Sequence, residues 1–404
     1  MKIAFVDNLS VGGGLSRFSL KLCESLIENY KDLFIDYYIH FKNLEQIPEI
    51  QHLNERVVVI ILKSTQPNNL GKRISNKLLA KLHLANPAEH TDITEIEKRI
   101  TTQYDLAYFP CAHMMKMPSL SIPAVATLHD FNWRYFFGTE IFNNKFTNLM
   151  DLEIQKWLSQ ASCISSSNHV VDEAKLMYPK VQKYPTVIPI SQVVVSKDVD
   201  DATADNILKQ LNIDFPYLIF PGNFYPHKNH LNLFTAFSIL KQNPVFKNYK
   251  LLLTGIGTDK VERAIATYGG LRKILNKAAY YDVMGMGYQP NEIIDVLIKK
   301  ATLLVSPSIY EAICTPALDA WSYGTPTAIS DIPPFREHET ALGIRSAFFD
   351  PMDTHNIAEV IGSCLKDLSK IKAEAKISQE KLAAYSWKEI SASYMNVFIK
   401  ATKQ

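Results

Sequence analysis

The feature of this sequence that most constrains its fold is a repeated alternation of short apolar runs with segments of helical spacing. In the segment 15–30, for example, large apolar side chains recur at the helical period. Six apolar runs that predict strands lie in the first half of the chain, at residues 2–7, 33–40, 56–62, 105–110, 124–130 and 161–167. Strands that are apolar throughout and alternate with helices are typical of a parallel sheet with both faces covered.

The same alternation restarts after a polar and acidic segment, residues 189–215, which the composition predicts to be a linker. Five further apolar runs follow it, at residues 217–222, 250–257, 281–286, 302–308 and 326–331. A chain of 404 residues is long enough for two domains. We therefore predict an α/β protein with two Rossmann-like, doubly wound domains, 1–190 and 191–385, that face each other across a cleft.

Composition narrows the cellular setting and the partners. The formal net charge of +2 gives no reason to expect nucleic acid as a partner. The N-terminal residues MKIAFVDNLS do not have the pattern of a signal peptide, and no run reaches the roughly 18 apolar residues of a membrane-spanning helix. The five cysteines are scattered without CxxC spacing, which favours reduced thiols. We expect a cytoplasmic protein.

The segment 71–84, GKRISNKLLAKLHL, has a basic stripe at Arg73, Lys77 and Lys81 beside an apolar one. A basic amphipathic helix can lie on an anionic surface, so one interpretation is peripheral contact with the inner face of the cell membrane. The other interpretation is a surface helix that packs on its own domain.

The loop and helix after the run 302–308 carry two acids, Glu311 and Asp319. Glu311 follows the carboxyl end of the predicted strand, and Asp319 lies on a helix that we expect to end at Gly324. Between them, backbone N–H groups at the helix N-terminus form a ready anion site. Acids that bind hydroxyls beside N–H groups that bind phosphate would suit a nucleotide sugar. The alternative is a surface acid and a helix carboxylate without a ligand.

Other loops at strand ends carry residues suited to phosphate. Lys228, in FPGNFYPHKNH, follows the run 217–222 and can meet a diphosphate as a compact charge. Glycines at further strand ends let a ligand approach the backbone closely. They are Gly255 and Gly287 in the second half, and Gly12, Gly13 and Gly14 in the first.

Five motifs occur in an order that resembles retaining glycosyltransferases of family 4, which have the GT-B fold. They read TLHDFNW, ISSSNHVVDEA, PGNFYPHKNH, SPSIYEAICTPALDAW and YSWKEISASYM, and together they cover nearly the whole chain. The resemblance implies transfer of a hexose from a nucleotide-diphosphate sugar, without a further cofactor. The acceptor would be a glycan or a lipid-linked saccharide, and the pathway surface polysaccharide assembly.

The resemblance also implies roles for particular residues. The first domain would bind the acceptor and the second the nucleotide sugar, and the helix from 386 to 404 would pack back on the first domain. Lys228 would neutralise the leaving diphosphate, Glu311 would contact the donor sugar, and His129 would face the transferred sugar. Donor contacts would come from Gly12, Gly13, Gly14, Asn223, Gly255, Gly287, Ala312, Ile313, Cys314, Thr315 and Asp319, with Asp319 on the ribose.

The sequence departs from the family pattern in three places. Asn223 stands where the family usually has arginine, which removes a phosphate cation that His227 or Arg17 could replace. Asp319 replaces a glutamate, and Ala-Ile-Cys replaces Gly-Phe-Gly. These differences bear on donor preference and on catalytic rate more than on the fold.

Metal dependence and three rival functions complete the predictions. The DVDD at 198–201 lies in the predicted linker, and REHET, around His338, favours a solvated helix over a metal cluster, so we predict no metal. The loop GGGLSR suggests an NAD-dependent oxidoreductase but lacks the third glycine of GxGxxG. Asn223 and Asp319 suggest a non-catalytic sugar-nucleotide binder, and a sugar-nucleotide epimerase would share the fold.

A lone histidine such as His129 is also compatible with a purely structural hydrogen bond.

Overall fold

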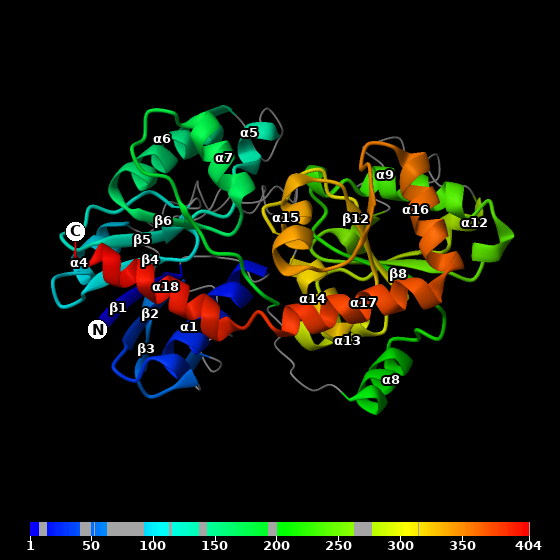
Figure 1. Cartoon of the computed structure of the whole chain (residues 1–404), viewed down its shortest axis with the longest axis horizontal. Coiled ribbons are helices and arrows are strands. Elements are labelled where there is room, and N and C mark those ends of the chain that lie inside the picture. Colours follow the sequence, from blue (N-terminus) through cyan, green and yellow to red (C-terminus); the bar gives the residue numbers. More distant parts are fainter. Residues whose placement is uncertain are drawn as a thin grey trace, which may run out of the picture. The chain divides into compact units, whose positions relative to one another are not determined.

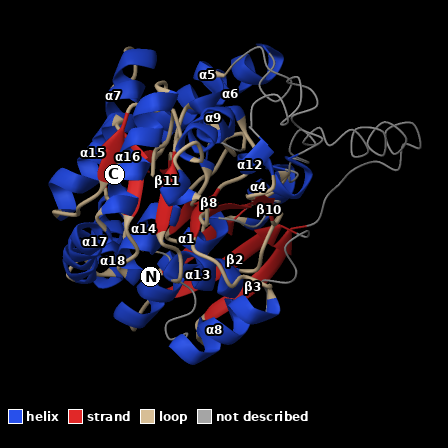
Figure 2. Ribbon diagram, turned by 90° about the vertical axis from the view of Figure 1, so that its right-hand side faces the viewer, coloured by secondary structure: helices blue, strands red, loops and turns tan. Residues whose placement is uncertain are grey.

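The computed structural model describes residues 1–7, 14–40, 50–51, 53–62, 93–112, 115–136, 144–192, 200–261, 277–313 and 315–403. The chain divides into two compact units (Figure 1). The first unit is Met1–Ile190 together with Trp387–Gln404, and the second is Ser191–Ser386. Each unit is an α/β structure built on its own parallel sheet, with helices around the strands (Figure 2).

Within the described residues, the first unit has a sheet of strand order β3-β2-β1-β4-β5-β6-β7, and each printed pair is parallel. The strands are β1 (Lys2–Asp7), β2 (Phe34–His40), β3 (Val57–Leu62), β4 (Leu106–Phe109), β5 (Ala124–Thr127), β6 (Ser162–Ser165) and β7 (Thr186–Val187). All six apolar runs predicted in this half form strands. The sequence did not indicate β7, because its two residues are too short for a pattern.

Most helices of the first unit connect these strands, and the last one follows the second unit in the sequence. The helices are α1 (Gly14–Asn29), α4 (Ile93–Arg99), α5 (Asn132–Tyr135), α6 (Asn144–Gln160), α7 (Asn168–Met177) and α18 (Trp387–Ala401). The chain's last helix, α18, lies beside α1 (Figure 1). The hydroxyl of Ser25 on α1 donates to the carbonyl of Trp387 at 2.8 Å. The C-terminal segment is thus part of the first unit.

The second unit has strand order β10-β9-β8-β11-β12-β13, again with parallel pairs. The strands are β8 (Tyr217–Pro221), β9 (Lys250–Thr254), β10 (Val283–Gly285), β11 (Leu303–Ser306), β12 (Thr327–Ser330) and β13 (Ala347–Phe349). The strand order reverses between β8 and β11. In open α/β sheets, the crevice outside the carboxyl ends of the strands at such a point is where ligands bind.

Helices cover both faces of this sheet. They are α8 (Asp201–Gln210), α9 (His230–Leu240), α12 (Lys277–Tyr280), α13 (Asn291–Lys299), α14 (Thr315–Tyr323), α15 (Pro333–Leu342), α16 (Thr354–Lys366) and α17 (Leu368–Ala383), with short 3₁₀ turns η3 (Pro226–Lys228), η4 (Pro244–Phe246) and η5 (Thr258–Lys260). Helix α9 packs with α16, whereas α14 packs with α13 and α17. The first pair lies above the strands in Figure 1 and the second group below them. Leucine and phenylalanine side chains of β8, β9 and α9 form much of the core.

The prediction that residues 189–215 form a linker is wrong in part, because α8 lies inside this segment. The Asp200 carboxylate accepts from the backbone N–H of Thr203 at 2.6 Å and so caps the helix. Asp205 forms an ion pair with Lys300 at 2.8 Å. Acids that the composition suggested were solvated in a linker act here as a cap and as a helix contact.

A buried lysine closes the turn after α9. The Lys241 ammonium donates to the carbonyl oxygens of Phe246, Lys247 and Tyr249, and it forms an ion pair with Asp282 at 2.7 Å. Its side chain is only 2% exposed. A buried charge is tolerated when its donors are satisfied in this way. Lys241 therefore links the segment between α9 and β9 to Asp282, the residue before β10.

We expect Lys241→Met to lower the free energy of unfolding by about 2 to 4 kcal/mol, because it leaves buried carbonyls and Asp282 without their donor. Urea denaturation monitored by circular dichroism measures this change. Lys247→Met is the matched control, since that side chain is exposed and its loss should cost no more than about 0.5 kcal/mol. Equal stability of the two variants would contradict the assigned role of Lys241.

Candidate active site

The candidate site lies where the strand order of the second unit reverses. β8 and β11 are neighbours in parallel register, with Leu303 opposite Leu218. Both strands therefore end at the same edge of the sheet. The chain leaves β8 into the turn that contains Lys228, and it leaves β11 into the loop that contains Glu311. Two residues that are 83 positions apart in the sequence are brought together in this way.

Lys228 and Glu311 form an ion pair, with the ammonium 2.5 Å from Oε1. The Glu311 side chain is 8% exposed and that of Lys228 is 19% exposed. Charges this well covered lose much of their hydration, so the pair is weak evidence for stability. A charged pair held at the ligand-binding edge of a parallel sheet is instead a candidate for function. The predicted donor site depended on Lys228, Glu311 and Asp319. The structure brings the first two of them together.

Backbone contacts join the two loops that carry this pair. Pro226 opens the 3₁₀ turn η3 at a position that needs no N–H donor, and Lys228 ends it. The N–H of Ile309 donates to the carbonyl of His227 at 2.9 Å. Asn229, the residue after Lys228, has a left-handed backbone. No role was predicted for Asn229 from the sequence, although an asparagine directly after a helical turn favours this conformation.

The loops after β8, β9 and β10 are bonded to one another. The Asn223 carboxamide oxygen accepts from the N–H of Ile256 at 2.8 Å, and the N–H of Gly255 donates to the carbonyl of Gly287 at 2.8 Å. Gly255 has φ of +120°, and a Cβ added to it would lie 2.7 Å from the Gly222 carbonyl. Position 255 therefore requires glycine because the backbone of the loop after β8 lies close to it. Contact of these residues with a donor remains a prediction.

Two buried histidines flank Lys228. Burial, followed by the positive charge of Lys228, lowers the pKa of His227 and of His230 from 6.5 to about 3. Both imidazoles are therefore neutral at pH 7. Burial beside Lys228 opposes a positive charge on His227, so the structure does not support the suggestion that His227 replaces the missing phosphate cation.

The segment after Glu311 leads into α14. Ala312 is buried and Ile313 is partly buried, and α14 begins at Thr315. Cys314 lies outside the described residues. Gly324 follows the helix with φ of +68°, as the predicted C-cap requires. Asp319 lies on α14 with a side chain that is fully buried, so the predicted contact with a ribose would require its carboxylate to be uncovered.

In the first unit, the predicted residue His129 follows β5. Its Nε2 atom lies 2.7 Å from the carbonyl oxygen of Pro110. A carbonyl only accepts, so Nε2 carries a proton in this contact. The Phe18 ring meets the imidazole edge to face. This supports the structural interpretation of His129 as a hydrogen-bonding residue, and its contact with a sugar remains a prediction.

Asp130, the residue after His129, accepts from the N–H of Asn132 at 3.2 Å, which orders the start of α5. Gly14 begins α1, while Gly12, Gly13 and the segment 71–84 lie outside the described residues. The part of the chain that the structure describes holds no helix long and apolar enough to cross a membrane.

The segment REHET lies in α15, but the prediction that it is solvated is wrong for His338. This side chain is 2% exposed and packs against Trp321, with ring centroids 6.0 Å apart. Its Nε2 atom has no hydrogen-bond partner among the described residues. Burial lowers its pKa from 6.5 to about 4. In the described ranges, no three histidine, cysteine or acidic side chains are placed to hold a metal ion.

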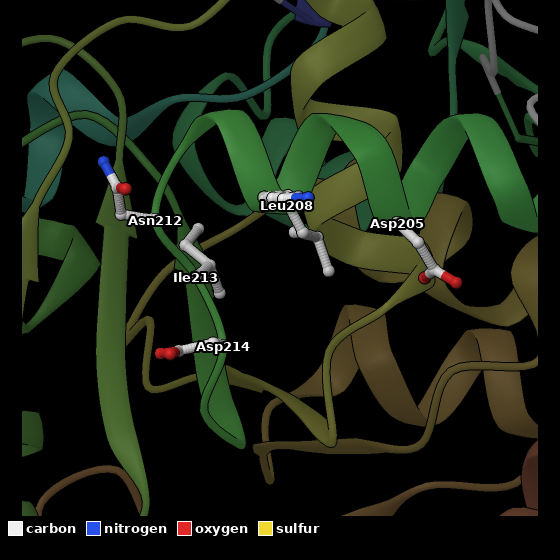
Figure 3. Close-up of a pocket in the computed structure, with 6 residues that line it drawn as sticks. Asp205, Leu208, Asn212, Ile213 and Asp214 are labelled. Atoms are coloured by element: carbon white, nitrogen blue, oxygen red, sulfur yellow. The ribbon is translucent and has the colours of Figure 1, made fainter.

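An open surface hollow of about 370 Å³ lies beside α8 (Figure 3). Its lining residues are Asp205, Leu208, Lys209, Asn212, Ile213 and Asp214. It shares no residue with the Lys228–Glu311 pair, and its acidic groups do not suit a phosphate ligand. We therefore place the candidate site at the edge of the sheet and not in this hollow.

Comparison with known sequences finds similarity to glycosyltransferases in the second half of the chain. Residues 204–381 match the model of the family described as glycosyl transferases group 1. The O-antigen chain mannosyltransferase B of Escherichia coli is 27% identical over 191 residues. This match covers 45% of each protein, so the chain spans less than half the length of the curated relative.

Comparison with solved structures covers both units. HepE of Anabaena in complex with UDP and glucose has a TM-score of 0.69 at 16% identity, over 99% of this chain and 100% of the other. WaaG, a glycosyltransferase involved in lipopolysaccharide biosynthesis, has a TM-score of 0.66 at 13% identity, over 98% and 99%. The predicted GT-B fold is confirmed. The family match and the curated relative show similarity to glycosyltransferases.

The buried imidazole of His338 should make stability depend on pH. Its pKa is about 4 in the folded protein and about 6.5 when unfolded, so between these values the unfolded chain binds more protons. Stability is therefore lost as the pH falls from 6.5 towards 4. We expect His338→Phe to reduce the loss of unfolding free energy between pH 7 and pH 5 by about 2 kcal/mol.

Urea denaturation at the two pH values measures this difference. His355→Phe is the control, because His355 is exposed on α16. An unchanged pH dependence in His338→Phe would show that His338 does not carry this proton linkage.

Proposed function

We propose that this chain is a retaining, metal-independent glycosyltransferase of the family 4 type. It would transfer a hexose from a nucleotide-diphosphate sugar to a glycan or lipid-linked saccharide in surface polysaccharide assembly. The observation that most supports this proposal is the Lys228–Glu311 ion pair at the edge where β8 and β11 end. A covered cation and a covered acid at this edge suit a ligand that has both phosphate and hydroxyl groups.

The proposed transfer requires a positive group near the leaving diphosphate and a negative group near the sugar. The bond between the anomeric carbon and the diphosphate oxygen breaks, so positive charge develops on the sugar and negative charge on the leaving group. The acceptor oxygen forms the new bond on the same face, and its proton leaves with the nucleoside diphosphate. The Lys228 ammonium stabilises the departing charge, and fixed charges of this kind supply much of an enzyme's rate enhancement.

Glu311 acts on the sugar side of the same bond. Its carboxylate can accept hydrogen bonds from sugar hydroxyls, which orients the ring relative to Lys228. Without a ligand, Lys228 and Glu311 satisfy each other across 2.5 Å. A nucleotide sugar would share both partners, with phosphate on the cation and hydroxyls on the acid. Binding would then replace one charge-assisted contact with several.

The relatives guide the choice of donors to test. The curated relative is named as a mannosyltransferase of the O-antigen chain, and the HepE structure contains UDP and glucose. A panel of UDP- and GDP-linked hexoses, including glucose and mannose donors, therefore covers both indications. Nuclear magnetic resonance of the transferred sugar would report whether its anomeric configuration is retained.

A non-catalytic nucleotide-sugar binder is the second candidate. It is favoured by Asn223, whose carboxamide oxygen is engaged by Ile256, and by the covered carboxylate of Asp319. Such a protein would bind the donor without hydrolysing or transferring it. The same donor panel, with NADH added to test the oxidoreductase alternative, separates these functions.

We expect Lys228→Met and Glu311→Gln each to lower sugar transfer by at least a hundredfold. Lys228→Met removes the charge that opposes the leaving diphosphate, and Glu311→Gln removes the carboxylate that orients the sugar. Release of nucleoside diphosphate from the donor panel measures turnover. Lys366→Met, an exposed lysine at the end of α16, is the control for loss of a positive charge. Wild-type turnover in both site variants would refute the assigned site.

We expect transfer to persist after the protein is dialysed against EDTA and assayed without added divalent cations. The reason is that Lys228 supplies a positive charge next to the leaving group, as a metal does in other transferases. Turnover with and without added Mg²⁺ or Mn²⁺ measures the effect. A loss above tenfold that either ion restores would contradict metal independence.

A further inference from the structure

The residue directly after Lys228 has an unusual backbone. Asn229 has φ of 57° and ψ of 35°, in the left-handed region. Among the described residues, Asn212 at φ of 55° is the other non-glycine residue with positive φ. Asparagine tolerates this conformation better than most residues, because its short polar side chain can bond to nearby backbone.

The side chain of Asn229 makes two hydrogen bonds that stabilise this conformation. Its Nδ2 atom donates to the carbonyl oxygen of Pro307 at 3.0 Å and to that of Pro351 at 2.8 Å. Pro307 directly follows β11, four residues before Glu311, and Pro351 follows β13. One carboxamide therefore joins three segments of the second unit, and both of its N–H donors are used. Asn232, one turn further along α9, also donates to Pro351, at 3.0 Å.

These contacts fix the distance between the two loops of the candidate site. The turn that ends at Lys228 is held to the loop after β11 by the Asn229–Pro307 bond and by the bond from Ile309 N–H to the His227 carbonyl. The ion pair between Lys228 and Glu311 closes the same junction. A lysine side chain is long and flexible, so the position of its backbone decides where the ammonium can reach.

We propose that Asn229 is a positioning residue for the candidate site. Its left-handed backbone and its two hydrogen bonds hold the Lys228 ammonium beside Glu311, where it meets the diphosphate of the donor. That the ligand is a diphosphate rests on the function proposed above. That Asn229 orders the loop after β11 does not depend on that function. Asn232 shares an acceptor with Asn229, but within the described residues its side chain makes no hydrogen bond to the loop that carries Glu311.

The variants separate the backbone from the carboxamide. Asn229→Gly keeps the left-handed conformation without strain and removes both side-chain bonds. Asn229→Asp keeps the shape but places carboxylate oxygens against two carbonyl oxygens. Asn232→Ala removes a bond to the same Pro351 oxygen, and Asn212→Gly makes the same substitution at the other left-handed asparagine, beside α8 (Figure 3).

Calorimetric titration with nucleoside mono- and diphosphates tests positioning against a merely structural role. The probes are UMP and UDP, and GMP and GDP. If Asn229 places Lys228, the dissociation constant for the diphosphate should rise about tenfold in Asn229→Gly, while that for the monophosphate stays within twofold. We expect a larger rise in Asn229→Asp, and values within twofold of wild type in Asn232→Ala and Asn212→Gly. Equal weakening of mono- and diphosphate in Asn229→Gly would overturn the positioning role.

Hydrogen–deuterium exchange gives a readout that needs no nucleotide. The Ile309 amide is bonded to His227, so peptides that cover residues 303–313 should exchange faster in Asn229→Gly than in wild type or in Asn232→Ala. If wild-type protein binds none of the four nucleotides, the proposed function fails and exchange alone decides about Asn229. Faster exchange in Asn229→Gly then supports its ordering of the loop, and unchanged exchange overturns it.

Discussion

The candidate site depends on the parallel pairing of β8 with β11. Connections run from β8 towards β9 on one side and from β11 towards β12 on the other, so the strand order reverses between them. With right-handed crossovers, the helices that follow, α9 and α14, lie on opposite faces of the sheet, as Figure 1 shows. The loops that follow these two strand ends carry Lys228 and Glu311, and they lie next to each other. The ion pair is a consequence of this topology more than of local sequence.

The electrostatics of the site concentrate positive charge on Lys228. Its neighbours His227 and His230 are buried, and burial lowers their pKa values to about 3, so they add no charge near neutral pH. Their neutrality has a further effect, since a charged imidazole beside Lys228 would compete for Glu311. A single ammonium held against a single carboxylate can respond to a ligand that offers a phosphate to one and hydroxyls to the other.

The sequence predicted the elements whose patterns are long, and it missed those that depend on tertiary context. Apolar runs identified β8 and β11, and the rule for strand ends selected Lys228 and Glu311 as neighbours. The three-residue strand β13 was missed, although β10 is equally short and was predicted from the run 281–286. The burial of His338 was missed because REHET is polar in composition, and only packing against Trp321 places that one side chain in the core.

The distances within the site also depend on tertiary contacts, so they could not be predicted from the sequence. The 2.5 Å contact of Lys228 with Glu311 depends on the left-handed turn at Asn229 and on its bonds to Pro307 and Pro351. Pro351 lies 122 positions away, so no local pattern could connect them. The covered position of Asp319 likewise depends on the helices around α14 and not on its spacing from Glu311.

The departure from the family pattern at Asn223 has a structural cause in the loop after β9. The N–H of Ile256 needs an acceptor, and the Asn223 carboxamide oxygen supplies it at 2.8 Å. An arginine has five donors and no acceptor, so it could not make this bond. The loops must also stay close, because a Cβ at Gly255 would lie 2.7 Å from the Gly222 carbonyl. At this position the chain has an inter-loop hydrogen bond in place of a cation. In the function proposed above, Lys228 would then neutralise the diphosphate from the position at which Asn229 holds it.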